Sequence, residues 1–269
     1  MRRILFTKAV ASGNDFVIIE KRHASRASRL AALAKTICDR RFGAGADGLI
    51  FLEKSAAADI KMRIFNSDGS EAQMCGNGAR CVALYCRKTN ITIETKAGIV
   101  KGKVRGEKVG VKLTDPSGYE PVVPIKINGR ELKVNSINTG VPHAVIFVDG
   151  IECIDVSEIG RQVRYLECFA PSGTNVDFVE ALDSRTIKVR TYERGVEDET
   201  LACGTGAAAS AIAASFQLPI SGKGGEQKIN VITRGGETLR VYFNSRNGKI
   251  NNVWLEGKAR IVYKGEYYV

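Results

Sequence analysis

The chain has 269 residues, of which 44% are hydrophobic and 26% charged, and its formal net charge is +11. This composition is that of a globular protein, and since no uninterrupted apolar run reaches the ~18 residues needed to cross a bilayer, we expect no membrane-spanning helix. The positive charge favours anionic or carboxylate-bearing partners, but the basic residues are scattered and only 7% of residues are aromatic, which argues against nucleic-acid binding.

In chain order, short alternating or apolar runs typical of strands dominate the sequence. A serine-rich start and a terminal Gly43 predict a helix over residues 25–43. Residues 76–89 and 204–217 are apolar on nearly every face, which predicts two buried helices. The predicted strands cover residues 3–10, 15–20, 47–53, 60–66, 91–104, 108–114, 143–149, 176–182, 186–192, 228–234, 238–243 and 252–269.

Seven cysteines with no regular spacing predict reduced thiols in a cytoplasmic protein, not a disulfide framework. The N-terminal stretch "MRRILFTKAV" has no long apolar region and no cleavage site after it, so we interpret it as a first strand. No CxxC or CxxH spacing occurs, and the two histidines, His23 and His143, lie far apart. We therefore expect no metal site.

Two stretches of the sequence echo each other. "FNSDGSEAQMCGNGAR" and "YERGVEDETLACGTGA" each run from a strand end through an acidic turn into Cys-Gly-x-Gly and a helix, and "NDFV" at 14–17 resembles "VDFV" at 176–179. Prolines and a glycine interrupt the pattern within residues 113–124, where we place a boundary. The sequence thus predicts two similar α+β domains related by a pseudo-twofold axis, with the active site in the cleft between them.

The echo places one thiol, Cys75 or Cys203, at the start of each buried helix. Unpaired N–H groups and a partial positive charge at a helix start favour an anion, so we expect a lowered thiol pKa and a binding site for a carboxylate. Two acid–base groups facing one carbon suit inversion at the α-carbon of an amino acid, where one removes a proton and the other delivers one. We therefore predict a two-base racemase or epimerase.

With these motifs in hand, the sequence resembles the diaminopimelate epimerase family over nearly its whole length. The resemblance is carried by six ordered blocks: "GNDF" (13–16), "RFGAGADGL" (41–49), "FNSDGSEAQMCGNGARC" (65–81), "NTGVPHAV" (138–145), "GTNVDF" (173–178) and "YERGVEDETLACGTGA" (192–207).

The resemblance implies a curved, mostly antiparallel sheet around a buried helix in each domain. It implies a first domain of residues 1–117 plus 258–269, carrying Cys75, and a second of residues 118–257, carrying Cys203. It further implies interconversion of LL- and meso-diaminopimelate in the synthesis of lysine and of cell-wall (peptidoglycan) precursors, with no cofactor, in a homodimer.

By resemblance, the catalytic residues are the two thiols with Glu193 and His143 as neighbours that tune or orient them. The expected substrate ligands are Asn14, Asn66, Gly76, Asn77, Asn175, Glu193, Arg194, Gly204 and Thr205.

Other interpretations stay open at this point. Asparagines near strand ends commonly make turns, and Glu193 with Arg194 could be an exposed ion pair. Val141 and Gly48 stand where some family members carry asparagine and glutamine, so the ligands of the distal end of the substrate are undetermined. The alternatives are a racemase of another amino acid, an isomerase like the phenazine-biosynthesis enzyme, and a non-catalytic ligand-binding or redox-sensing protein.

Overall fold

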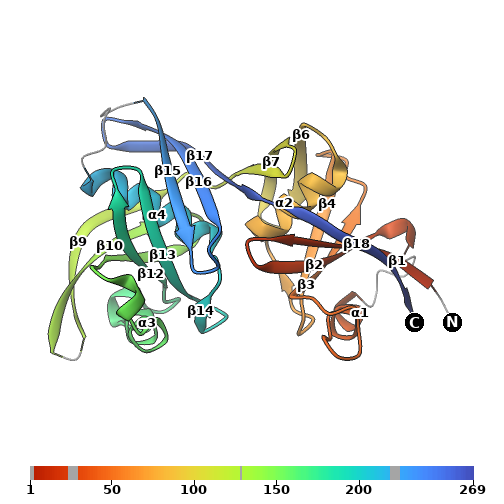
Figure 1. The fold of residues 1–269 in the computed structure, drawn as a ribbon, viewed down its shortest axis with the longest axis horizontal. Helices are drawn as coiled ribbons and strands as arrows, with labels where there is room; N and C mark the ends of the chain where they lie inside the picture. Colours follow the sequence, from red (N-terminus) through yellow and green to blue (C-terminus); the bar gives the residue numbers. More distant parts are fainter. Residues whose placement is uncertain (1–2, 24–29, 128, 219–224) are drawn as a thin grey trace. The chain divides into compact units, whose positions relative to one another are not determined.

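The structure is a computed structural model, and it describes residues 3–23, 30–127, 129–218 and 225–269. The chain forms two compact units, an N-terminal unit of Met1–Val111 with Gly257–Val269 and a C-terminal unit of Lys112–Glu256 (Figure 1). The proline-bearing segment 113–124, where the sequence places a boundary, begins the C-terminal unit.

The N-terminal unit has a mostly antiparallel sheet in the order β18-β1-β2-β3-β4-β6-β7-β8, in which only the β2–β3 and β4–β6 pairs of this order are parallel. The short β5 forms a hairpin with β4. The strands are β1 (Arg3–Ala11), β2 (Asn14–Glu20), β3 (Gly48–Glu53), β4 (Ile60–Asn66), β5 (Glu71–Ala72), β6 (Asn90–Thr95), β7 (Gly98–Arg105), β8 (Lys108–Lys112) and β18 (Arg260–Tyr268).

The C-terminal unit repeats this arrangement in the order β9-β10-β11-β12-β13-β15-β16-β17, with β11–β12 and β13–β15 parallel and β14 paired with β13. The strand β18 from the end of the chain takes in the first sheet the position that β9 takes in the second. The strands are β9 (Ser117–Ile127), β10 (Arg130–Asn138), β11 (Pro142–Phe147), β12 (Asn175–Asp183), β13 (Thr186–Glu193), β14 (Asp198–Thr200), β15 (Gly225–Thr233), β16 (Thr238–Arg246) and β17 (Lys249–Lys258).

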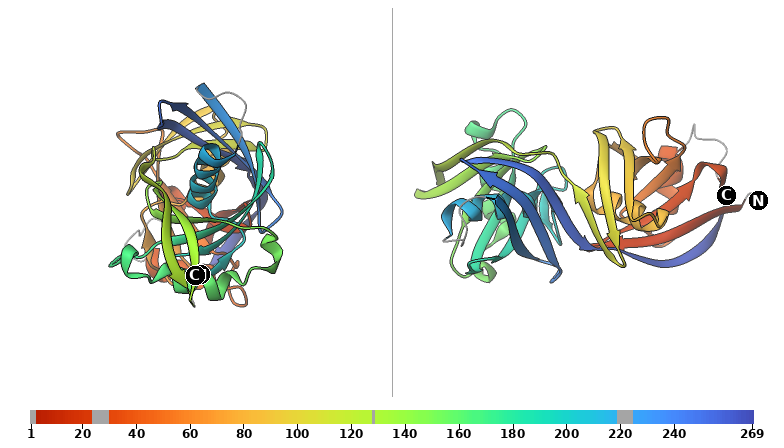
Figure 2. Two further views of the ribbon diagram at one scale, coloured as in Figure 1. Left: turned by 90° about the vertical axis from the view of Figure 1, so that its left-hand side faces the viewer. Right: turned by 90° about the horizontal axis from the view of Figure 1, so that it is seen from above.

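One helix lies inside each sheet. The helix α2 (Gly76–Cys86) packs against β1, β2, β4, β6, β7 and β18, and α4 (Gly204–Gln217) packs against β10 to β13, β15 and β16. Figure 2 shows α4 running through the middle of the strands of its unit. Residues 204–215 are Gly, Ala, Ser or Thr apart from Ile212, so the strands can approach the helix axis closely. The two predicted buried helices and the α+β class with two similar domains are confirmed.

A second helix covers the outer face of each sheet. The helix α1 (Leu30–Ile37) buries Leu30, Ala34 and Ile37 against an apolar cluster from β1 to β4. The predicted helix over 25–43 is too long at its C-terminal end, and residues 25–29 lie outside the described residues. Three short 3-10 helices are described: Lys21–His23, Ile151–Cys153 and Glu167–Phe169.

In the C-terminal unit, four elements lie where the sequence predicts no helix or strand: α3 (Val156–Arg164), β9, β10 and β14. The helix α3 was missed, because it buries only Val156, Gly160 and Val163 and is otherwise polar. The segment 113–124 was predicted to break the pattern, yet most of it belongs to β9. Its prolines fit because β9 is an edge strand that pairs only with β10 among the described strands.

Candidate active site

Cys75 and Cys203 are the N-cap residues of α2 and α4. Their backbones are extended, with φ −140° and ψ 122° at Cys75 and φ −109° and ψ 116° at Cys203. In each case the sulfur accepts a hydrogen bond from the backbone N–H three residues later, at 3.4 Å from Gly78 and from Gly206. Serine, threonine, aspartate and asparagine are the usual caps. The sequence echo is therefore a repeated piece of three-dimensional structure with a thiol at the same place in both copies.

The expected carboxylate donors follow these caps directly. Gly76 and Asn77 are the first two residues of α2, and Gly204 and Thr205 are the first two of α4. N–H groups in the first turn of a helix lack partners within the helix and can bind an anion. A Cβ added at Gly76 would meet no heavy atom within 4 Å, so a ligand could approach the backbone there.

The thiol of Cys203 is nearly buried, at 8% exposure. Burial raises its pKa well above the ordinary value, the carboxylates of Glu193 and Asp177 raise the pKa further, and hydrogen bonds from Thr205 and Gly206 lower it. The sequence predicts a lowered thiol pKa at both helix starts. For Cys203 this prediction is wrong, because desolvation and two carboxylates outweigh the helix start. Cys203 therefore holds its proton, as an acid must.

Glu193 lies at the end of β13, and its Oε2 accepts a hydrogen bond from Thr200 Oγ1 at 3.0 Å. Burial raises the pKa of Glu193, which the hydrogen bond from Thr200 and the proximity of His143 partly offset. Glu193 in turn raises the pKa of Cys203, so its carboxylate acts electrostatically on that thiol.

His143 is fully buried in β11, at 0% exposure. Its Nδ1 lies 2.7 Å from Oδ2 of Asp177, and its Nε2 lies 3.5 Å from Nδ2 of Asn175. Asn175 also accepts a hydrogen bond from the backbone N–H of Arg194 at 2.8 Å. The predicted residues His143, Asn175 and Arg194 thus form one connected group in the C-terminal unit.

The side chain of Arg194 donates to the carbonyl oxygen of Ser172 at 3.3 Å. Within the described residues no carboxylate is paired with this guanidinium. The exposed ion pair between Glu193 and Arg194 that the sequence left open is absent from the described residues, and the Arg194 guanidinium has donors left for a carboxylate.

In the N-terminal unit, two predicted ligands belong to a chain of side-chain hydrogen bonds. Arg80 Nη2 donates to Asn77 Oδ1 at 2.6 Å, and Asn77 Nδ2 donates to Asn14 Oδ1 at 2.7 Å. Asn14 Nδ2 then donates to Asp47 Oδ2 at 3.1 Å. Since a guanidinium can only donate and a carboxylate accepts, both amides have a defined orientation.

Asn66 stands apart from this chain. It ends β4, is exposed, and donates through Nδ2 to Ser70 Oγ at 2.9 Å. It pairs in register with Gly48 of β3, where an added Cβ would lie 2.9 Å from the carbonyl oxygen of Phe65. A larger residue at Gly48 would therefore need a shift of the backbone. Val141 is half-buried, and its carbonyl oxygen accepts from Thr139 N–H at 3.1 Å.

Sequence reasoning missed three polar residues of these networks: Arg80, Asp47 and Asp177. Arg80 and Asp177 are both 0% exposed. The available signal was a charged residue in an otherwise apolar stretch, since Arg80 lies in a buried helix and Asp177 stands between Val176 and Phe178 in a predicted strand. A buried charge is stable only when hydrogen-bonded or paired, so each marks a polar network.

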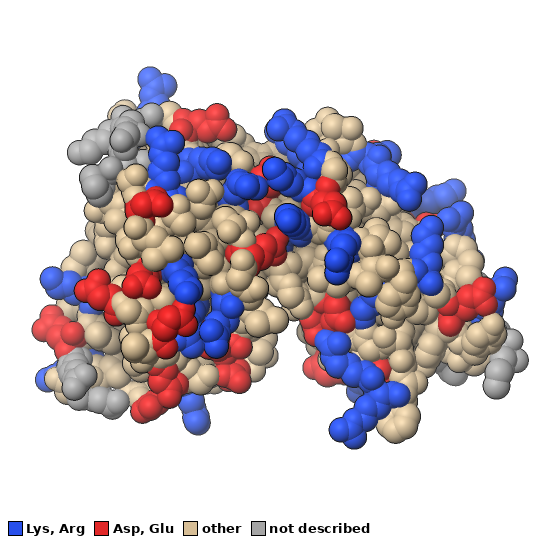
Figure 3. Space-filling view, in the orientation of Figure 1, with Lys and Arg blue, Asp and Glu red and all other residues tan. Residues whose placement is uncertain are grey.

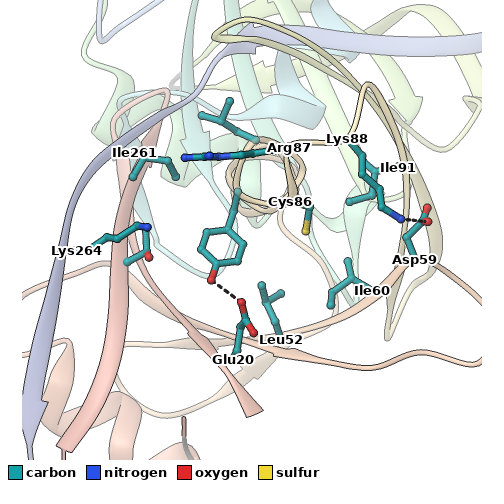
Figure 4. Close-up of a pocket in the computed structure, with 13 residues that line it drawn as sticks. Glu20, Leu52, Asp59, Ile60, Cys86, Arg87, Lys88, Ile91, Ile261 and Lys264 are labelled. Atoms are coloured by element: carbon teal, nitrogen blue, oxygen red, sulfur yellow. Dashed lines mark hydrogen bonds and ion pairs between the residues drawn. The ribbon is translucent and has the colours of Figure 1, made fainter. Parts of the chain in front are cut away.

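A cavity of about 490 Å³ lies in the N-terminal unit at the C-terminal end of α2 (Figure 4). Four of its polar side chains are paired with one another: Tyr85 donates to Glu20 at 2.7 Å, and Lys88 pairs with Asp59 at 2.6 Å. None of the predicted site residues lines it. It lies at the other end of a helix about 16 Å long from Cys75, so it is distinct from the cysteine site.

On the face drawn in Figure 3, basic and acidic side chains are interspersed over both units. No cluster of three or more His, Cys, Asp or Glu able to hold a metal occurs among the described residues. In the same part of the chain, every helix is too short or too polar to span a bilayer.

Comparison with known proteins gives one consistent result. A family model described as diaminopimelate epimerase matches residues 6–117 and 135–262. A diaminopimelate epimerase of Aquifex aeolicus is 42% identical over 97% of this chain and 96% of its own length. One of Methanocella arvoryzae is 41% identical over 99% of this chain and 97% of its own length.

Among solved structures, a phenazine biosynthesis protein of Bacillus anthracis covers all of both chains with a TM-score of 0.77 at 20% identity. At that identity the likeness shows the fold alone.

Proposed function

Since the chain belongs to the diaminopimelate epimerase family, we propose that it interconverts LL-diaminopimelate and meso-diaminopimelate by proton transfer at the α-carbon. The observation that carries the mechanism is the repeated cap, a cysteine in the same geometry at the start of α2 and of α4. Two thiols, each at the start of a helix, suit a reaction in which one cysteine acts as the base and the other as the acid.

In the proposed step, the thiolate of one cysteine takes the α-proton and the electron pair of the C–H bond stays on the substrate. The thiol of the other cysteine delivers its proton to the opposite face of the same carbon and becomes a thiolate. The reverse reaction exchanges the roles, so the protein is unchanged after a cycle. Cys75 and Cys203 act on one carbon, which requires the substrate to be held by residues of both units.

The electrostatics of Cys203 support its starting role as the acid, since burial and the neighbouring carboxylates raise its pKa. Cys75 is half-buried. In the proposed cycle it is the thiolate, and therefore the base, when substrate first binds. The resting protein can therefore convert directly the isomer whose α-proton faces Cys75.

The negative charge that develops on the substrate during proton removal needs fixed donors. We assign the first-turn N–H groups of Gly76, Asn77, Gly204 and Thr205 to the reacting carboxylate, because a helix start stabilises an anion without reorganisation.

The amides of Asn14, Asn66 and Asn175 and the guanidinium of Arg194 are assigned to the amino group and the distal carboxylate. Val141 and Gly48 supply no polar side chain for this end of the substrate.

The proposal includes a place for the protein in lysine biosynthesis in the cytoplasm, as a homodimer. The comparisons support the activity through the names of relatives that match nearly the whole chain.

A substrate screen tests the function. Reduced protein is incubated with LL-diaminopimelate and, separately, with proline, hydroxyproline, histidine and glutamate, and the isomers are separated by chiral chromatography. Conversion of diaminopimelate alone is expected. Conversion of another amino acid would favour a racemase of the same fold. Binding without conversion would indicate a non-catalytic protein.

A further inference from the structure

The carboxylate of Asp177 is buried beneath the start of α4, and each of its two oxygens has a hydrogen-bond partner. Asp177 is 0% exposed, its Oδ1 accepts from Thr191 Oγ1 at 2.7 Å, and its Oδ2 lies 2.7 Å from Nδ1 of His143. A Cβ added at Gly206, in the first turn of α4, would lie 2.3 Å from Oδ1. Asp177 therefore connects β11, β13 and the helix that Cys203 caps.

The contacts of the imidazole define which nitrogen of His143 carries the hydrogen. A carboxylate oxygen accepts, so Nδ1 of His143 is the donor toward Asp177. The other nitrogen, Nε2, lies 3.5 Å from Nδ2 of Asn175.

The amide of Asn175 cannot turn to offer its oxygen instead. Its Nδ2 donates to the carbonyl oxygen of Pro142 at 3.2 Å, and its Oδ1 accepts from the backbone N–H of Arg194 at 2.8 Å. Both partners are backbone groups with fixed roles. A donor therefore faces Nε2 of His143, and Nε2 carries a lone pair and no hydrogen.

We infer that Asp177 is a positioning residue that holds His143 in the Nδ1–H form and, through His143, orients Asn175 and the turn at Arg194. The link to substrate rests on the proposed function, in which Asn175 and Arg194 bind the amino acid. Asp177 touches no substrate itself. It lies two hydrogen bonds from Asn175 and three from the backbone of Arg194.

Two further titratable groups lie near this network: Glu193, which is near His143 and Asp177, and Cys203, which is near Asp177 and Glu193. A hydrogen on Nε2 of His143 would place a donor against the amide hydrogens of Asn175, which would push that amide away from Pro142 and Arg194. Asp177 thus acts by fixing the tautomer of His143.

Nitrogen-15 NMR of the imidazole tests the tautomer directly. In a His23→Gln variant, His143 is the remaining histidine of the chain, and its Nδ1 is expected to be protonated and its Nε2 unprotonated at neutral pH. The opposite assignment, or an even mixture, would overturn the inference. A Thr191→Val variant removes the other partner of Asp177, and it is expected to lower stability while keeping the Nδ1–H form.

A double-mutant cycle tests the route through His143. Asp177→Asn is expected to lower kcat/KM for diaminopimelate by about 10–100-fold, mainly through KM, which is the loss known for carboxylates that orient metal-binding histidines. In a His143→Gln background the same change is expected to cost less than about twofold, because the residue through which it acts is gone. If the loss in the double variant equals the product of the losses in the two single variants, Asp177 acts by a route other than His143.

The two experiments separate this inference from the proposed function. If the wild-type protein does not convert diaminopimelate, the proposed function fails while the NMR measurement still decides the tautomer. If it converts diaminopimelate and the tautomer is reversed, only the positioning role fails.

Discussion

Two thiols with the same cap geometry have different surroundings. Cys75 is half-buried, whereas Cys203 is buried and faces the carboxylates of Glu193 and Asp177. A helix start therefore does not by itself lower the pKa of a thiol, because at Cys203 desolvation and neighbouring charge exceed its contribution. In the proposed reaction, this difference in surroundings assigns the role of the first acid to Cys203.

A substitution at Glu193 tests the electrostatic part of this difference. Glu193→Gln removes a negative charge that raises the pKa of Cys203, so that pKa should fall and more thiolate should be present at a given alkaline pH. The rate at which iodoacetamide modifies Cys203, followed by mass spectrometry over a pH series, should rise in the variant. The exposed Glu167→Gln is the matched control, and an unchanged or slower rate at Cys203 would contradict the assignment.

Among single residues, the sequence singled out those with a distinctive local pattern, such as a cysteine before Gly-x-Gly. It did not reveal Asp177 or Arg80, because their roles depend on partners that are distant in sequence, Thr191 and His143 for the first and Ser12 for the second. The prediction of a lowered pKa for Cys203 was wrong for the same reason, since it did not include the carboxylates of Glu193 and Asp177.

Among the elements, α2 and α4 occupy equivalent places in the two units, but the space for a side chain differs between the matching glycines Gly78 and Gly206. An added Cβ at Gly206 of α4 would meet the fixed, hydrogen-bonded carboxylate of Asp177 at 2.3 Å. At the matching Gly78 of α2 it would meet the methyl ends of Ile64 and Ile50 at 3.1 and 3.3 Å, and these can shift.

The two glycines provide a matched pair of substitutions. Gly206→Ala should destabilise the protein by about 1–3 kcal/mol through overpacking and should lower activity. Gly78→Ala should be near neutral, because the strain is small and alanine favours a helix by about 1 kcal/mol over glycine. Urea unfolding of both variants measures this, and equal losses would contradict the packing described here.

The hairpin of β1 and β2 depends on the charge of Asp15. Its carboxylate pairs with Lys8 at 2.7 Å and Arg40 at 2.9 Å. Burial alone would raise the pKa of Asp15, but hydrogen bonds from Arg40 and Lys8 outweigh it and lower that pKa to about 2.

Because the folded pKa of Asp15 lies below the unfolded value of 3.8, this stabilisation is present above about pH 4 and is lost as the pH falls toward 2. Urea unfolding over a pH series should show a steeper acid loss in wild type than in Asp15→Asn, with the exposed Asp149→Asn behaving like wild type. Parallel acid losses in all three proteins would exclude this role for Asp15.

Elements with a strong apolar period were predictable, and weakly marked ones were not. The two inner helices stood out because few of their residues are charged or strongly polar, whereas α3 presents only three buried residues to the sheet. Proline marks a break in most strands, and only the edge position of β9 makes it acceptable there.

At the scale of the whole molecule, the chain is two copies of one arrangement of strands and helices. The sequence echo around the two cysteines was enough to predict the repeat. The contribution of the last strand to the first sheet followed only from the family resemblance, because β18 pairs with β1 across nearly the whole length of the chain. Pairing between the two ends of a chain leaves no local signal.

The proposed reaction makes a prediction about the two units together. Sulfurs that flank one carbon should be able to join, because a disulfide needs Cα atoms only about 4.4–6.8 Å apart after small adjustments. Mild oxidation without ligand should therefore link Cys75 to Cys203 and abolish activity, and a reductant should restore it. Mass spectrometry of the unreduced digest detects the linked peptides, and full activity in oxidant would count against the proposed geometry.

In the proposed reaction, both cysteines exchange protons with one α-carbon. The direct measurement is NMR of LL-diaminopimelate incubated with reduced protein in deuterated water, together with separation of the isomers. We predict deuterium at the α-carbon and formation of the meso isomer, with epimerisation falling by about 10²–10⁴-fold or more in Cys75→Ala and in Cys203→Ala and unchanged in the exposed Cys168→Ser. An unlabelled α-carbon with wild-type protein, or substantial epimerisation by either alanine variant, would contradict the account.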